Sequence, residues 1–205
     1  MRILILLIVS LSTWLSAIAQ KPNVVLIMAD DLGYHDLGCY GHPKIKTPVL
    51  DRLAKHGVKL TGFYAGATVC TPSRIALMTG SYPTRLGWSK GVVGHILSTD
   101  HGLSPKALTM AEHFKSAGYK TAISGKWHLG DRPSFRPHRQ GFDRTFYINK
   151  SNNQTDELWQ ADKLLEKPFN NRFLKEKFTR EAISFIQSNK DKTFFLYLPY
   201  SAPHF

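Results

Sequence analysis

Residues Asn23–Asp31, with the sequence NVVLIMADD, form an unbroken apolar run that ends in two adjacent carboxylates. The run is rich in β-branched side chains and shows no alternation of apolar and polar positions. A continuous apolar run of this length is typical of a strand that is buried on both faces of a parallel sheet. We therefore predict a central parallel strand over 23–29.

Helix and strand signals alternate along the rest of the chain. Thr47 and Pro48 are typical of a helix start and Gly57 of a helix end, and residues 58–63 then predict a second strand. The same kinds of signal predict a helix with Pro72 in its first turn and Gly80 at its end, helices from the Thr109–Glu112 capping box to Gly118 and from about Asn171 to Ile186, and strands over 119–124 and 194–198. This alternation predicts an α/β sheet. Residues 131–156 are rich in Pro, Arg, Asn and Gln and have no period, so we predict a long loop there.

The composition is that of an ordinary globular chain. It has 205 residues, of which 42% are hydrophobic and 20% charged, which excludes a disordered tail and a polytopic membrane protein. The formal net charge of +12 predicts attraction to polyanions and leaves nucleic acid, acidic glycan and anionic membrane open. Only Cys39 and Cys70 are present, so at most one disulfide can form.

The first 19 residues have the pattern of a secretory signal peptide. Arg2 precedes an apolar run, and Ala17-Ile18-Ala19 fits a cleavage site, so the mature chain is expected to begin at Gln20. The apolar stretch is interrupted by serines and is shorter than the ~20 residues of a membrane span, so no stable membrane insertion is expected. An exported chain can form a Cys39–Cys70 disulfide.

Polar residues capable of chemistry follow three of the predicted strands. These are Asp30-Asp31, Lys126-Trp127-His128 and Pro203-His204. Ligands of open parallel sheets gather beyond the carboxyl ends of the strands, so the three groups are expected to share one crevice. The paired carboxylates suit a hard divalent cation, and a turn or helix cap is the alternative use of such a pair.

Cys70 lies at the predicted start of a helix, where free amides and the helix dipole favour an anion. Arg74 lies one turn further along the same face, and its guanidinium can contact an anion held at Cys70. A buried, inert thiol beside a surface arginine is the alternative at this point.

Three motifs bear on that choice. The segment Cys70–Arg74 (CTPSR) with the trailing Thr79-Gly80 resembles the hallmark of the formylglycine-dependent sulfatases, and Gly118–His128 (GYKTAISGKWH) resembles the second signature of that family. The opening segment Asn23–Tyr34 is similar to the family's first strand and its metal-binding pair. The resemblance runs from about Lys21 to the last residue.

The resemblance implies an alkaline-phosphatase-like α/β fold, with a mixed, mostly parallel central sheet flanked by helices. It implies sulfuric ester hydrolysis by an arylsulfatase-like enzyme in which a maturation enzyme oxidises Cys70 to formylglycine (3-oxoalanine) during export. The hydrated aldehyde then attacks sulfur, the alcohol leaves, and loss of sulfate restores the aldehyde.

The resemblance also assigns roles to single residues. Asp30, Asp31 and Cys70 match the family's calcium-binding residues, and Arg74 matches the arginine that supports the aldehyde hydrate. Lys126 and His128 match sulfate-binding and hydrate-assisting residues. His204 resembles a histidine near the leaving oxygen, and Ser151 resembles a serine close to the hydrate, so Lys126, His204 and Ser151 are expected to contact substrate.

The pattern implies an incomplete domain. The expected division is a signal peptide over 1–19 and the N-terminal part of a sulfatase catalytic domain over 20–205. The family's remaining calcium ligands and a further lysine normally lie downstream, so we expect the chain alone to be inactive and strand 194–198 to be exposed as a sheet edge.

Two other functions compete with this interpretation. A helix N-terminus, a cation and an arginine would equally serve a phosphate or phosphonate ester hydrolase of the same superfamily. A secreted, non-catalytic polyanion-binding protein would use the charge and the basic stretch Arg132–Arg144. The expected substrate is a sulfate ester, with a sulfated polysaccharide compatible with the charge, and nucleic acid is not expected as a partner. Cys39 is expected to pack as a small apolar residue.

Overall fold

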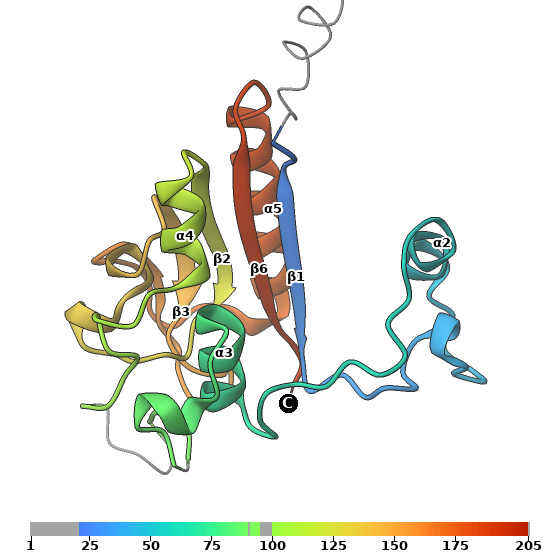
Figure 1. Ribbon diagram of the computed structural model, residues 1–205, viewed down its shortest axis with the longest axis horizontal. Helices are drawn as coiled ribbons and strands as arrows, with labels where there is room; N and C mark the ends of the chain where they lie inside the picture. The colour runs from blue at the N-terminus through green and yellow to red at the C-terminus, as the bar shows by residue number, and fades with distance from the viewer. Residues whose placement is uncertain (1–20, 90, 95–99, 205) are drawn as a thin grey trace, which may run out of the picture.

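The computed structural model describes residues 21–89, 91–94 and 100–204, and its core is one sheet with helices on both faces (Figure 1). The predicted signal peptide lies outside the described residues. Among the described residues, no helix is long and apolar enough to cross a membrane.

The described sheet has six strands in the order β1-β6-β2-β3-β4-β5. The strands β1 (Val24–Asp30), β6 (Phe194–Pro203), β2 (Lys120–Lys126) and β3 (Arg144–Ile148) pair in parallel. The short strands β4 (Leu158–Gln160) and β5 (Lys163–Glu166) continue the sheet in antiparallel pairing. The expected mixed, mostly parallel sheet is confirmed.

Helices cover the two faces of the sheet (Figure 1). The helix α5 (Leu174–Ser188) packs on one face, where Phe178 and Phe185 meet apolar residues of β6. The helices α3 (Cys70–Thr79) and α4 (Met110–Ser116) lie over the other face, where Ile75 joins the cluster that contains Phe195. Alternate residues of β6 thus enter two separate cores, as the pleat of a strand requires.

The predicted ends of several helices are confirmed. The helix α2 (Pro48–His56) and α3 begin and end as expected, and Gly80 after α3 adopts the left-handed conformation with its amide donating to the Ala76 carbonyl. The capping box of α4 is formed, because the Thr109 hydroxyl accepts from the Glu112 amide and the Glu112 carboxylate accepts from the Thr109 amide.

The predicted places of two strands in the sheet are wrong. β1 pairs only with β6 among the described strands, and its side chains alternate in burial, with Val25 45% and Ile27 61% exposed. Conversely, residues 194–198, expected at an edge, lie between β1 and β2 and are buried. An apolar run indicates that a segment joins a sheet. Which strands then lie beside it depends on the connections between the strands.

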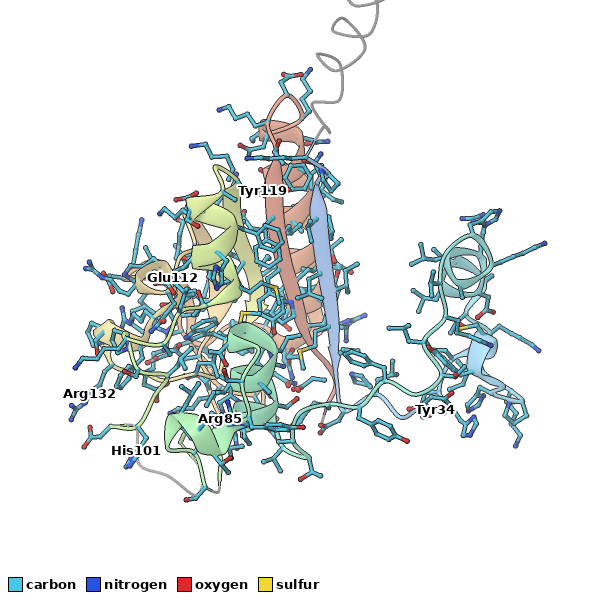
Figure 2. All side chains as sticks on the ribbon, in the orientation of Figure 1. Tyr34, Arg85, His101, Glu112, Tyr119 and Arg132 are labelled. Carbon is cyan, nitrogen blue, oxygen red and sulfur yellow. The ribbon has the colours of Figure 1, made fainter. Side chains whose placement is uncertain are left out.

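The predicted strand over 58–63 is also wrong. Val58 and Phe63 are 87% and 70% exposed, and no described strand lies beside them to pair with. The segment belongs to an arm, residues 31–66, that carries the 3₁₀-helix η1 (Gly38–Tyr40) and α2 away from the sheet (Figure 1). Tyr34 marks this arm in Figure 2, and its ring packs against His35 and Tyr40 within the arm.

The predicted loop over 131–156 is wrong in its second half, because β3 occupies Arg144–Ile148. The 3₁₀-helices η2 (Pro83–Leu86), η3 (Pro133–Phe135), η4 (Pro137–Arg139) and η5 (Asn171–Phe173) complete the described elements. β3 is too short for its sequence to show a strand period. Its pairing with β2 makes this segment a strand.

Gly125 allows β2 to approach β6 closely just before Lys126. Its φ is +144°, and a Cβ there would overlap the carbonyl oxygen of Pro199 in β6. We expect Gly125→Ala to lower the free energy of unfolding by more than ~3 kcal/mol, measured by urea denaturation. The control is Gly118→Ala, which has a φ of +86° but open space around the new methyl, and should cost only ~1–2 kcal/mol. Equal losses would contradict the role of the close approach.

Candidate active site

The carboxyl ends of β1, β2 and β6 meet the N-terminal end of α3, as expected from the sequence. β1 ends at Asp30, β2 ends at Lys126, and α3 begins at Cys70. Asp30 and Pro203 are register partners, and the amide of His204 donates to the Asp30 carbonyl at 3.0 Å. The crevice therefore gathers side chains from positions 30, 70, 126 and 204.

A buried ion cluster forms the floor of this site. Asp30 is 3% exposed, and its carboxylate binds the Arg74 guanidinium at 3.0 Å and the Lys126 ammonium. Burial raises the pKa of Asp30, but the charges and hydrogen bonds of Arg74 and Lys126 outweigh it and hold the pKa below its usual value. Asp30 is therefore a carboxylate throughout the neutral pH range.

Lys126 links the cluster to the candidate nucleophile. Its fully buried ammonium contacts Asp30, lies 2.6 Å from the Ser151 hydroxyl and 3.2 Å from the Cys70 sulfur. Ser151 is 1% exposed and lies beside Lys126, and its expected contact with substrate stays a prediction.

Cys70 is a half-buried free thiol, and Cys39 is also free, so the disulfide that export would permit is absent from this structure. The Cys70 sulfur lies 3.8 Å from Asp30 Oδ1 and opens toward the crevice from the first residue of α3. Cys39 lies in the arm on η1, remote in the fold from this crevice (Figure 1).

Arg74 is fully buried and acts within the floor of the site. Its guanidinium donates to the Lys126 carbonyl at 2.7 Å and to Asp30, and among the described residues it donates no hydrogen bond to Cys70. Arg74 therefore fixes the end of β2 and adds positive charge beneath the nucleophile position.

His128 is buried in a neutral form. Its ring Nε2 lies 3.0 Å from the Val93 carbonyl, which can only accept, so Nε2 carries the proton and Nδ1 presents a lone pair. Nδ1 has no hydrogen-bond partner among the described residues. Burial and the nearby Lys126 charge lower the pKa of His128 from 6.5 to about 3.

Asp31 and His204 lie at the solvent side. Asp31 has a φ of +62°, its side chain is 63% exposed, and its carboxylate lies 3.6 Å from His204 Nε2. Ligand atoms of Asp30, Cys70 and His204 all lie within 4.8 Å of one another, a spacing that could hold a metal ion. Asp31 lies beside this group through its contact with His204.

The ligand atoms in this part of the site can be compared with those that the expected calcium prefers. Calcium takes oxygen ligands, which Asp30 and Asp31 offer, whereas a thiol at residue 70 is a softer ligand. An oxygen in place of the Cys70 sulfur would put two oxygen donors, from residues 30 and 70, in the group whose third member is His204, with the Asp31 carboxylate beside His204. The residues present therefore fit calcium in the oxidised form of residue 70.

Two supporting residues escaped the sequence analysis. The Thr71 hydroxyl donates to the His128 carbonyl at 3.0 Å and accepts from the Val93 amide, so it ties α3 to the loop that holds His128. The Tyr197 hydroxyl lies 3.5 Å from Arg74 under the cluster. Thr71 lies inside the hallmark motif, which could have indicated it, whereas Tyr197 lies in an apolar strand that gives no such signal.

The chain is similar to a known family, to curated proteins and to solved structures. The family model described as Sulfatase matches residues 22–205. Arylsulfatase A of Homo sapiens is 50% identical over 140 residues, which cover 67% of this chain and 27% of that protein. A solved structure from work on the metabolism of glycosaminoglycans by Bacteroides thetaiotaomicron has a TM-score of 0.80 at 29% identity, over 91% of this chain and 52% of that one.

A further solved structure contains a ligand. The protein BT4656, in complex with its substrate D-glucosamine-2-N,6-O-disulfate, is similar with a TM-score of 0.73 at 28% identity, over 90% of this chain and 35% of that one. These likenesses confirm the predicted alkaline-phosphatase-like architecture and the resemblance drawn from the motifs. The chain belongs to the sulfatase family, and it spans between about a quarter and a half of the length of these relatives.

The depressed pKa of His128 predicts a pH dependence of stability. The unfolded chain takes up a proton at this residue as the pH falls below 6.5, whereas the folded chain does so only near pH 3. Stability is therefore lost as the pH falls through this window, by roughly 2 kcal/mol between about pH 7 and pH 5.

His128→Asn should remove this contribution, so the free energy of unfolding of the variant should fall less steeply between those two pH values than that of the unsubstituted protein. Denaturant unfolding at each pH measures both slopes. His56→Asn is the matched control, because His56 is exposed at the end of α2. Identical slopes for all three proteins would show that His128 takes up its proton at the same pH in the folded and the unfolded chain.

Proposed function

We propose that the protein carrying this chain hydrolyses sulfate esters, with residue 70 as the nucleophile after Cys70 has been oxidised to formylglycine during export. The observation that carries the proposal is the fully buried Lys126 ammonium, 3.2 Å from the Cys70 sulfur at the start of α3. Family membership supports the sulfate ester as the group that is cleaved.

The charge balance of the site supports an anionic substrate. Two buried cations, Arg74 and Lys126, face one buried carboxylate, Asp30, so the floor of the site carries a net positive charge. A sulfate ester is a monoanion whose charge moves toward the leaving alcohol as the sulfur–oxygen bond breaks. Fixed positive groups at low dielectric stabilise such a transition state.

A hard cation is the expected cofactor. Calcium, when bound, would supply a Lewis acid that draws charge from the sulfate oxygens. Asp30 and Asp31 would hold it together with the oxygen that replaces the Cys70 sulfur. The remaining ligands would come from water or from segments beyond those described.

The chain's own residues have separable roles in this reaction. Lys126 donates to the oxygen of the nucleophile and to the sulfate, while the Ser151 hydroxyl fixes the direction of its ammonium. The lone pair of His128 Nδ1 can accept a proton as the adduct breaks down. His204, whose ring nitrogen lies within 4.8 Å of the ligand atoms of Asp30 and Cys70, would give a proton to the leaving alcohol.

We further propose an exported enzyme whose division follows the sequence prediction, with a signal peptide over 1–19 and the N-terminal part of the catalytic domain over 20–205. A formylglycine-generating enzyme would be its maturation partner. Sulfated sugars are the substrate class favoured by the neighbours, one of which was solved with a disulfated glucosamine.

Maturation and turnover test the nucleophile. Mass spectrometry of the peptide containing residue 70, from protein purified from its exported form, should show the thiol replaced by an aldehyde. Cys70→Ala should abolish sulfate release from an aryl sulfate, while Cys39→Ala, which changes a thiol in the arm, should retain it. An unmodified thiol in the active, exported protein would contradict this mechanism, and faster cleavage of the matched phosphate ester would favour a phosphate ester hydrolase.

Lys126→Met tests the buried cation. Loss of one fixed donor to the developing charge is expected to lower kcat by roughly 10²- to 10³-fold. Lys150→Met is the control. Lys150 lies next to Ser151 in the sequence and pairs with Asp131 at 3.0 Å, but it makes no contact with Cys70. Unfolding curves of both variants separate lost catalysis from lost structure. A folded Lys126→Met protein with ordinary turnover would show that Lys126 is not part of the reaction.

A further inference from the structure

A pocket of about 500 Å³ adjoins the candidate active site at His204. Its walls come from Asn152 in the loop after β3, from η5 and the first turn of α5, and from the end of β6. His204 belongs to both places, because it lines the pocket and its ring nitrogen lies within 4.8 Å of the ligand atoms of Asp30 and Cys70. A molecule with its sulfate at residue 70 would therefore meet this pocket with the next part of its structure.

Two cations line the pocket without compensation. Arg172 and Lys175 form no ion pair with any acidic side chain of the described residues. By contrast, Arg132, Arg136 and Arg144 in the basic stretch each pair with a carboxylate at 2.6–2.8 Å. The basic stretch is thus largely neutralised, whereas the pocket keeps two positive charges available to an anion.

The remaining polar groups suit a sugar ring. Asn152 donates from Nδ2 to Asn171 Oδ1 at 3.3 Å, and its own carbonyl oxygen has no partner among the described residues. Ser201 adds a hydroxyl to the pocket lining. Amide and hydroxyl groups that alternate with cations match the hydroxyls and charged substituents of an acidic sugar.

We propose that this pocket binds a second anionic group, a sulfate or a carboxylate, carried by the sugar whose sulfate ester is cleaved. The proposal rests on the proposed function and gives its substrate class as a sugar with at least two negative substituents. Arg172 and Lys175 are specificity residues in this assignment, since they contact a group of the substrate that lies away from the reacting sulfur.

The test compares two sugars that differ by one charge. The probes are D-glucosamine-2-N,6-O-disulfate and N-acetyl-D-glucosamine 6-O-sulfate, whose substituent at position 2 is uncharged. We expect kcat/KM to be about tenfold higher for the disulfated sugar. The double variant Arg172→Gln/Lys175→Gln should remove that preference, mainly through KM. The control Lys190→Gln/Lys192→Gln removes the same charge from the turn after α5 and should keep the preference.

Binding separates failure of this assignment from failure of the proposed function. Calorimetric titration of both sugars into Cys70→Ala protein should show tighter binding of the disulfated sugar, and the added Arg172→Gln/Lys175→Gln change should remove the difference. Such binding without any turnover in the parent protein would overturn the proposed reaction and support the pocket. Turnover without a charge preference, or binding of neither sugar, would overturn the pocket and leave its cations to pair with acidic side chains of another polypeptide segment.

Discussion

The contact between Asp30 and the two cations Arg74 and Lys126 organises the structure around it. Each member comes from a different element, β1, α3 or β2, so the cluster holds the two strands and the helix in one arrangement. Burying three charges is costly, and only a complete set of partners offsets the loss of water. Loss of Asp30 would leave the two buried cations without a counter-charge, at a cost of roughly 3–5 kcal/mol. The position of Cys70 depends on this floor.

The residues of the site could be predicted from the sequence more completely than the order of the strands in the sheet. The residues at 30, 70, 126 and 204 could be brought together from the rule that strand ends share an edge, and the structure places them there. The order of the strands could not be obtained in this way. The run at 24–29 has the composition of a central strand, yet Val25 and Ile27 are exposed because, among the described residues, the apolar cluster under α5 does not extend over that face of β1.

Side chains that act through contacts distant in the sequence were also beyond prediction. Thr71 binds the His128 carbonyl across a separation of 57 residues, and Tyr197 reaches Arg74 across 123. The motif around Thr71 could indicate the residue but not its distant partner, and the apolar pattern around Tyr197 indicates neither. The arm at 31–66 shows the same limit, since the apolar residues at 58–63 would form a strand only beside a partner strand.

The place of β6 between β1 and β2 sets an order of assembly during synthesis. β1 emerges first, but its neighbour in the sheet lies about 170 residues later, as the contact between Asn23 and Phe194 shows with a separation of 171. Contacts of such length form slowly, because a long loop must close before they are gained. Until β6 is made, the apolar β1 lacks the one partner that it has among the described strands, and Asp30 has no fixed place beside Lys126. The nascent chain therefore passes through a long interval in which Cys70 lies outside its finished surroundings and is open to chemical modification.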